Sequence, residues 1–196
     1  MKVLIIGGGG IGSWLIARLA RLRDYNQLNG LDALVVADDD EIEDKNLPYQ
    51  NFELDEIMDS KALALDARYG YTGKEMRITT HEHLEPFDMI VCAVDNPKAR
   101  RLVYEHCSTR PNKYFIDLRA EGSAVWGITS DAGWNLEQLK DTLGDEDADD
   151  KSCQLEYELS AGIIQLGNTI IAEIGAQWIL NKLRNKKNPA VFSQRF

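Results

Sequence analysis

A glycine-rich turn near the N-terminus constrains this 196-residue chain more than any other feature. A short apolar run at 2–6 breaks into Gly-Gly-Gly-Gly-Ile-Gly at 7–12, and apolar residues then recur at spacings of three and four. The run predicts a buried strand and the spacing predicts a helix. The turn satisfies G-x-G-x-x-G, in which backbone N–H groups at a helix N-terminus approach phosphate oxygens closely. A tight turn without a ligand is the alternative. We expect nucleotide contacts from Gly7, Gly9, Gly10, Ile11 and Gly12.

Apolar runs and helical spacings alternate along the rest of the chain. Further strands are expected at 34–37, 76–79, 89–94, 114–118 and 123–129, and helices at 11–22, 57–69, 97–107 and 159–183. This alternation predicts βαβ units and a mostly parallel sheet with helices on both faces. The last two strands are joined by only a few residues, which permits only an antiparallel pair. We therefore predict an α/β, Rossmann-like fold with antiparallel strands at one edge.

The length suits one domain, which we place over 1–196. Within it, the segment 133–151 is rich in Asp and Glu and is expected to be a flexible acidic loop. Residues 188–196 are expected to form a C-terminal tail.

Charge and cysteine content exclude several classes of protein. Lys and Arg number 22 and Asp and Glu number 32, which gives a net charge of −10. This balance argues against nucleic acid or an anionic membrane surface as a partner. No apolar stretch approaches the roughly 20 residues that span a bilayer. Three scattered cysteines without a C-x-x-C pair indicate a reducing compartment, so we expect a cytoplasmic protein.

An acidic residue follows the second expected strand. Asp38 stands about where a carboxylate binds a ribose hydroxyl in dinucleotide-binding folds. A helix cap or a solvated loop residue would look the same. With the glycine turn, the ribose role is favoured, which leaves a nicotinamide enzyme and an ATP enzyme as candidates.

Two further segments favour ATP. The segment 38–50 reads DDDEIEDKNLPYQ, the segment 91–100 reads VCAVDNPKAR, and Lys61 lies on the helix between them. Together these segments resemble the ThiF/MoeB family, the bacterial relatives of ubiquitin-activating enzymes, in a compact form without zinc motifs. That family carries Asn-Leu-x-Arg-Gln after its ribose-binding Asp and later an apolar strand followed by Asp-Asn-x-x-x-Arg. The resemblance covers about residues 2–130.

The resemblance implies an ATP- and Mg²⁺-dependent adenylation. The C-terminal carboxylate of a small ubiquitin-like or sulfur-carrier protein ending in glycine would attack the α-phosphate of ATP, and a homodimer is the expected assembly. Asp95 would coordinate Mg²⁺, a cation that favours carboxylate oxygen. Arg100 would steady the Asp95 loop or reach phosphate. The other implied nucleotide-binding residues are Asp38, Asp40, Asn46, Gln50 and Lys61, of which Lys61 also neutralises phosphate charge.

Each of these residues has a simpler interpretation. Asp95 could cap the helix that follows it, Lys61 could be an exposed helix lysine, and Asn46 could be a turn residue. Cys153 occupies a place where some relatives carry an acceptor thiol. Its acidic neighbours would raise the pKa of that thiol, so a packing role is the favoured alternative.

Two departures from the family pattern keep other functions open. Tyr49 stands in place of the phosphate-binding arginine, and a neutral phenol cannot make a guanidinium's bidentate contact. The helix that precedes the first strand in the family does not appear before residue 2. A nucleotide-binding interaction module without turnover is therefore one alternative. An NAD-dependent oxidoreductase, based on the glycine turn and Asp38 alone, is another.

Overall fold

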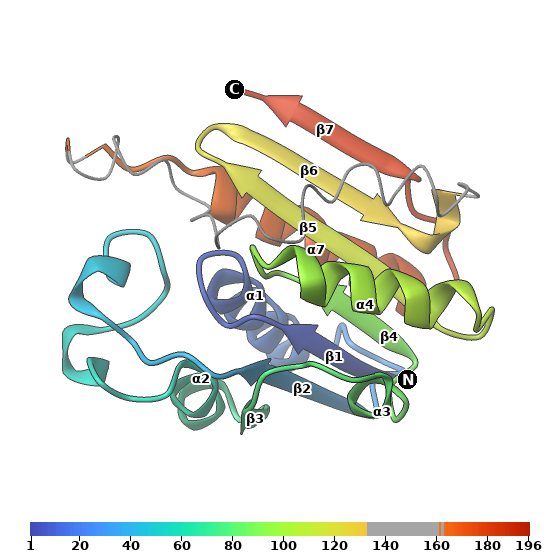
Figure 1. The fold of residues 1–196 in the computed structure, drawn as a ribbon, viewed down its shortest axis with the longest axis horizontal. Coiled ribbons are helices and arrows are strands. Elements are labelled where there is room, and N and C mark those ends of the chain that lie inside the picture. Colours follow the sequence, from blue (N-terminus) through green and yellow to red (C-terminus); the bar gives the residue numbers. More distant parts are fainter. Residues whose placement is uncertain (133–160, 162) are drawn as a thin grey trace.

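The computed structural model describes residues 1–132, 161 and 163–196. Within these residues one sheet holds seven strands in the order β3-β2-β1-β4-β5-β6-β7 (Figure 1). Their bounds are β1 (Lys2–Ile6), β2 (Ala33–Asp38), β3 (Thr72–Glu75), β4 (Met89–Cys92), β5 (Tyr114–Glu121), β6 (Ala124–Thr129) and β7 (Val191–Arg195). The first five run parallel and the last two pair antiparallel. The predicted α/β fold with an antiparallel edge is confirmed.

Helices cover both faces of this sheet. The helices α1 (Gly12–Asp24), α2 (Lys61–Tyr69) and α7 (Gly167–Leu183) pack on one face, and α3 (His81–Leu84) and α4 (Pro97–Ser108) pack on the other. Short 3₁₀ turns are η1 (Asp44–Asn46), η2 (Leu54–Glu56) and η3 (Ser130–Ala132). The central strands have apolar side chains on both faces: Val3 and Ile5 of β1 face the α1 side, whereas Leu4 and Ile6 face α4. Burial on both faces is what a parallel sheet between helices requires.

The strand order reverses between β1 and β4. Ile6, the last residue of β1, pairs with Ala37 of β2 on one side and with Cys92 of β4 on the other. The carboxyl ends of these three strands therefore lie side by side. In open α/β sheets ligands bind in the crevice at such a switch point.

Some expected boundaries differ from the observed ones. The expected strand 76–79 is a connection, and the edge strand β3 precedes it at Thr72–Glu75. An edge strand with three exposed residues needs no apolar run, and buried Ile78 gave the misleading signal. The helix expected at 57–69 begins at Lys61. The helix expected at 159–183 is described from Gly167.

The expected C-terminal tail contains a strand instead. Its residues 191–195 form β7, which pairs with β6, while Asn188 fixes the turn that leads into it. The backbone N–H of Asn188 donates to Asp131 Oδ2, and its amide Nδ2 donates to Tyr114 Oη and Trp178 O. These contacts join distant parts of the chain, so local composition could not indicate them.

Two further expectations concern the acidic loop and the lack of a segment that spans a membrane. The acidic segment 133–151 lies outside the residues that the structure describes, so the expected loop stays a prediction. None of the helices in the described part of the chain combines the length and apolar character that a bilayer-crossing segment needs.

Candidate nucleotide site

The glycine turn follows β1 directly and has little room for side chains. Gly7 has a φ of +96°, and a β-carbon there would lie 2.7 Å from the carbonyl oxygen of Ala93. A β-carbon at Gly12 would lie 1.9 Å from the carbonyl oxygen of Gly7. Among the hydrogen bonds between described residues, none uses the N–H of Gly9 or Gly10. Glycine at 7 and 12 is thus required by the fold itself, and the middle of the turn presents open donors.

Asp38 ends β2 beside this turn. Its Oδ2 accepts from the Gly8 N–H at 2.6 Å and its Oδ1 accepts from the Asp40 N–H at 2.8 Å. Burial raises the pKa of the Asp38 carboxyl above its usual value, although these two hydrogen bonds act in the opposite direction. The carboxylate therefore holds the turn in position as well as facing the pocket expected to take a ribose.

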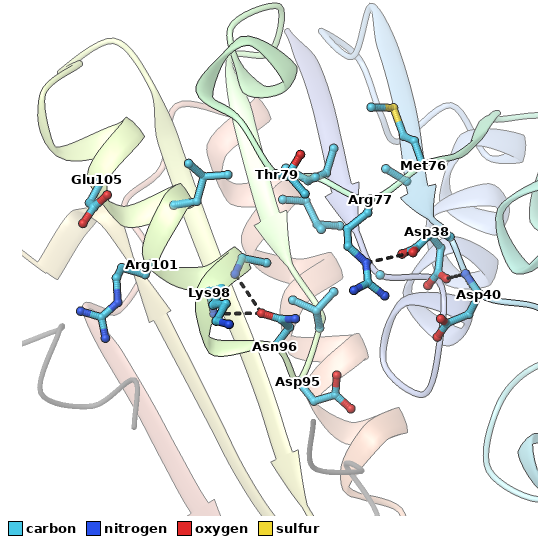
Figure 2. Close-up of a pocket in the computed structure, with 18 residues that line it drawn as sticks. Asp38, Asp40, Met76, Arg77, Thr79, Asp95, Asn96, Lys98, Arg101 and Glu105 are labelled. Atoms are coloured by element: carbon cyan, nitrogen blue, oxygen red, sulfur yellow. Dashed lines mark hydrogen bonds and ion pairs between the residues drawn. The ribbon is translucent and has the colours of Figure 1, made fainter. Parts of the chain in front are cut away.

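A pocket of about 570 Å³ opens at the switch point, on the α4 face of the sheet. Figure 2 shows Asp38, Asp40 and Arg77 on one side of it, and Asp95, Lys98 and Arg101 on the other. Arg77 Nε forms an ion pair with Asp39 Oδ2 at 2.9 Å. Apolar atoms come from Ile6, Ala37, Met76, Ile78, Val94 and Leu102. A mixed apolar and charged lining of this size suits a nucleotide.

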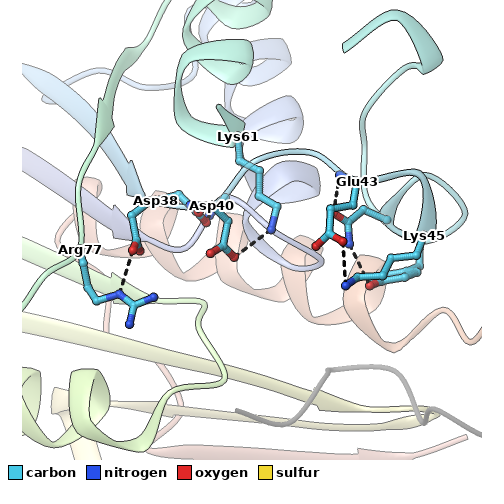
Figure 3. Close-up of polar contacts among 10 residues, drawn as sticks. Asp38, Asp40, Glu43, Lys45, Lys61 and Arg77 are labelled. Carbon is cyan, nitrogen blue, oxygen red and sulfur yellow. Dashed lines mark hydrogen bonds and ion pairs between the residues drawn. The ribbon is translucent and has the colours of Figure 1, made fainter. Parts of the chain in front are cut away.

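Lys61 is held at the base of α2 and does not point into solvent. Its side chain is 7% exposed, and Nζ lies 2.9 Å from Asp40 Oδ2 (Figure 3). The Lys61 N–H also donates to the Asp40 carbonyl oxygen at 3.0 Å. The alternative of an ordinary exposed lysine is therefore wrong. Hydrogen bonds run without a break from Gly8 through Asp38 and Asp40 to this buried cation.

The segment around η1 brings Asn46 and Gln50 toward the turn. Asn46 is 3% exposed, and its Oδ1 accepts from the Glu43 N–H in a capping box. The Gln50 amide lies beside Gly9, where a β-carbon would be 3.7 Å from Nε2. Its Oε1 is buried and has no hydrogen-bond partner in the described structure. Asn46 is therefore a structural cap, whereas Gln50 has an unused polar atom at the turn.

Tyr49 does not reproduce the charge of the arginine that it replaces. Its hydroxyl accepts from Asn46 Nδ2 at 3.2 Å, and its carbonyl oxygen accepts from Trp14 Nε1 at 3.2 Å. Another cation would have to supply the charge that Tyr49 lacks. Arg68 is not available for this, because it already donates to Asn51 O and Glu56 Oε2. Lys45 forms an exposed ion pair with Glu43, and Arg101 lines the pocket from α4.

Asp95 follows β4 and leaves the capping of α4 to its neighbour. Asn96 is the N-cap, and its Oδ1 accepts from the N–H groups of Lys98 and Ala99 at 2.9 and 3.1 Å. The alternative in which Asp95 caps the helix is therefore wrong. The Asp95 side chain is one of those that line the pocket (Figure 2). One carboxylate beside a phosphate site is the usual protein contribution to a Mg²⁺ site.

Arg100 supports the Asp95 loop from inside the protein. Its guanidinium donates to the carbonyl oxygen of Val94 and, through Nη1, to Asp117 Oδ1 at 2.9 Å. Arg100 is 7% exposed. Of its two expected roles, the structure favours steadying the loop over contact with phosphate.

Asp117 and Asn168 were not expected from the sequence. Asp117 is 1% exposed, and Arg100, Arg119 and Tyr104 all donate to its carboxylate. Burial alone would raise the pKa of Asp117, but the two guanidinium groups lower it below the usual value. Asn168, near the start of α7, lies against Gly10. Asn168 is one of several polar residues in α7, so the sequence carried no signal that set it apart.

The described cysteines and histidines do not line this pocket. Cys92 and Cys107 are buried, and burial raises the pKa of the Cys107 thiol to about 12. Cys153 lies outside the described residues. His81 and His83 belong to the short helix α3, and no group of three metal-ligating side chains occurs among the residues described.

Comparisons with known proteins show the family and the fold of this chain. A model of the ThiF family matches residues 1–196. The crystal structure of SeMet PaaA is 18% identical over 100% of this chain and 60% of PaaA, with a TM-score of 0.69. E. coli MccB with succinimide is 19% identical over 99% of this chain and 63% of MccB, with a TM-score of 0.66. No curated protein sequence matches the chain.

The match to a third solved structure covers most of that protein's chain. E. coli tRNA N6-threonylcarbamoyladenosine dehydratase, TcdA, is 15% identical over 94% of this chain and 86% of TcdA, with a TM-score of 0.64. By contrast, the chain spans less than two thirds of PaaA and of MccB. At these identities the likeness shows a shared fold.

Proposed function

The chain belongs to the ThiF family, and from that premise we propose that it binds ATP and adenylates a carboxylate. The substrate that we propose is the C-terminal carboxylate of a small ubiquitin-like or sulfur-carrier protein ending in glycine. The carboxylate oxygen would attack the α-phosphorus, and the bond from that phosphorus to the oxygen bridging the α- and β-phosphates would break. The products would be an acyl-adenylate and pyrophosphate. E. coli MccB has been crystallised with ATP and TcdA with AMP, which supports an adenine nucleotide as the ligand.

One observation carries this proposal. The chain of hydrogen bonds from Gly8 through Asp38 and Asp40 ends at the buried ammonium of Lys61. The same unit thus contains a carboxylate suited to ribose and a cation suited to phosphate. The Asp40 side chain is 61% exposed, so a phosphate could replace it as the partner of Lys61.

The residues present fit the groups that the reaction needs. Asp38 lines the pocket and is oriented by two backbone donors, and the Gln50 amide, whose Nε2 can donate to a phosphate oxygen, lies beside Gly9. Asp95 would hold Mg²⁺, which supplies positive charge to the phosphates when bound. Arg100 would keep Asp95 in position through Val94. Lys61 would stabilise the charge that spreads over the α-phosphate as the carboxylate attacks.

Exchange of pyrophosphate into ATP tests the proposal. We expect exchange only when ATP, Mg²⁺ and a carrier with a free C-terminal glycine are present, and no exchange with the same carrier amidated at its C-terminus. Asp95→Asn should lower the exchange rate about 100-fold or more, since it removes the Mg²⁺ ligand. Asp24→Asn, at the far end of α1, is the matched control and should leave the rate unchanged.

Three results would contradict the proposal. Exchange that persists with the amidated carrier would exclude the carboxylate as substrate. ATP binding without exchange in a screen that includes a verified carrier would favour the interaction module that Tyr49 suggests. Calorimetric titration in which NAD binds more tightly than ATP with Mg²⁺ would favour the oxidoreductase. The homodimer stays a prediction, to be checked by light scattering.

A further inference from the structure

Asn168 has a buried side-chain amide that no described residue satisfies. It is the second residue of α7 and is 1% exposed. Neither Nδ2 nor Oδ1 has a hydrogen-bond partner in the described structure. Buried polar groups are nearly always paired, because an unpaired one loses its hydration without compensation. An unpaired amide of this kind indicates a missing partner.

The amide of Asn168 faces the glycine turn. A β-carbon at Gly10 would lie 2.4 Å from Asn168 Nδ2 and 3.0 Å from its Cγ. The Gln50 amide flanks the adjacent Gly9 and also has a buried oxygen without a partner. Two side-chain amides from distant parts of the chain therefore flank the middle of one turn.

The electrostatics at this point favour an anion. The turn leads into α1, a helix of 13 residues, and Asn168 lies in the first turn of α7, a helix of 17 residues. Neither helix has an acidic residue in its first turn. Neither helix therefore has its own counter-charge at its positive dipole end. Asp38 binds the N–H of Gly8, but no described residue accepts a hydrogen bond from the N–H of Gly9 or Gly10.

We propose that Asn168 is a nucleotide-binding residue whose Nδ2–H donates to a phosphate oxygen held at the Gly9–Gly10 turn. This inference rests on the proposed function, because ATP supplies that phosphate. The position explains why residue 10 is glycine: the Asn168 amide occupies the space of its side chain. The phosphate would provide the acceptor that the amide lacks, and Gln50 would approach from the Gly9 side.

Calorimetric titration with ATP, AMP and adenosine tests the assignment. We expect Asn168→Ala to weaken ATP and AMP about tenfold or more, because a hydrogen bond to a charged oxygen is lost. Adenosine, which has no phosphate, should bind within about twofold of the wild type. Unchanged AMP affinity in the variant, or an equal loss for adenosine, would overturn the role of Asn168 alone. Absence of all nucleotide binding in the wild type would overturn the proposed function as well.

A pair of leucine variants separates ligand binding from a structural role. The Asn188 amide is also buried but is paired with Tyr114, Trp178 and Asn181. We expect Asn188→Leu to lower the Tm of the nucleotide-free protein by about 4–8 °C. Asn168→Leu should leave the Tm unchanged or raise it while still weakening AMP. A Tm loss in Asn168→Leu as large as in Asn188→Leu would make Asn168 a structural residue and overturn the proposal.

Discussion

Under α4, both oxygens of the buried Asp117 carboxylate accept hydrogen bonds, whereas beside the glycine turn the buried amide of Asn168 has no partner among the described residues. The two groups lie at opposite faces of one sheet and are each 1% exposed. The two side chains are therefore equally buried, but only the Asp117 carboxylate is hydrogen-bonded within the described structure. Asp117 stabilises the fold, since its pairing is complete without a ligand.

The contrast separates two ways of using a buried polar residue. A paired group such as Asp117 positions others: Arg100, which it holds, fixes the carbonyl oxygen of Val94 next to Asp95. An unpaired group costs stability in the free protein and recovers that cost when a partner arrives.

Asp117→Asn should have the largest effect on stability. It leaves Arg100 and Arg119 without their counter-charge, and we expect a loss of about 3–5 kcal/mol in the free energy of unfolding at pH 7. Urea denaturation measures it. The pKa of Asp117 is lowered in the folded protein, so this stabilisation is complete above the ordinary Asp value of 3.8 and is lost as the pH falls below it. The difference between variant and wild type should therefore shrink below about pH 4.

The control for that prediction is an exposed ion pair. Asp24 lies 3.3 Å from Arg23 and is 63% exposed. Asp24→Asn should cost less than about 1 kcal/mol. Equal losses in the two variants would show that the Asp117 network does not stabilise the fold.

Gly10→Ala should have an intermediate effect that depends on Asn168. The new methyl group would overlap the amide, and we expect a loss of about 1–3 kcal/mol in nucleotide-free protein. Adding Asn168→Ala should recover most of the loss, measured as the coupling energy of a double-mutant cycle. Gly9→Ala makes only ordinary contact, 3.7 Å from Gln50, and should change stability by less than about 1 kcal/mol. Additive effects at positions 10 and 168 would contradict the observed approach.

His106 should give the smallest effect, visible as a pH dependence. It is fully buried under α3, and neither ring nitrogen has a hydrogen-bond partner in the described structure, although Nε2 lies 3.6 Å from Glu85 Oε2. Burial, with a contribution from Arg110, lowers its pKa to about 4. The unfolded chain therefore binds a proton between pH 6.5 and 4 that the folded protein does not, so stability falls as the pH falls through this range.

We expect the wild type to lose about 1 kcal/mol through this histidine between pH 7 and 5.5. His106→Phe should flatten the dependence in urea denaturation, while His83→Gln should keep it. A slope that is unchanged in His106→Phe would show that another group titrates.

The sequence predicted the fold well because its signals were local. Apolar runs marked β1 and β4. Asp38, which ends β2, and Asp95, in the loop after β4, lie at the carboxyl ends of neighbouring parallel strands, as the topology requires. The predicted position of β3 was wrong because an edge strand needs no apolar run to mark it.

The site was only partly predictable because its bonding is not local. Adjacent Asp95 and Asn96 are both good caps, and only the backbone conformation selects Asn96. The burial of Lys61 depends on its contact with Asp40. Asn168 contacts the turn although it is far from Gly10 in the sequence, so no spacing rule could connect the two residues.

That last contact has an evolutionary consequence. Positions 10 and 168 compete for one volume although nearly the whole sequence separates them. A lineage that gained a side chain at 10 would need a smaller residue at 168, whereas a lineage that kept Gly10 would be free to retain asparagine. The two positions should therefore vary together in an alignment of close relatives. Such covariation would record the shape of the turn without any structure being solved.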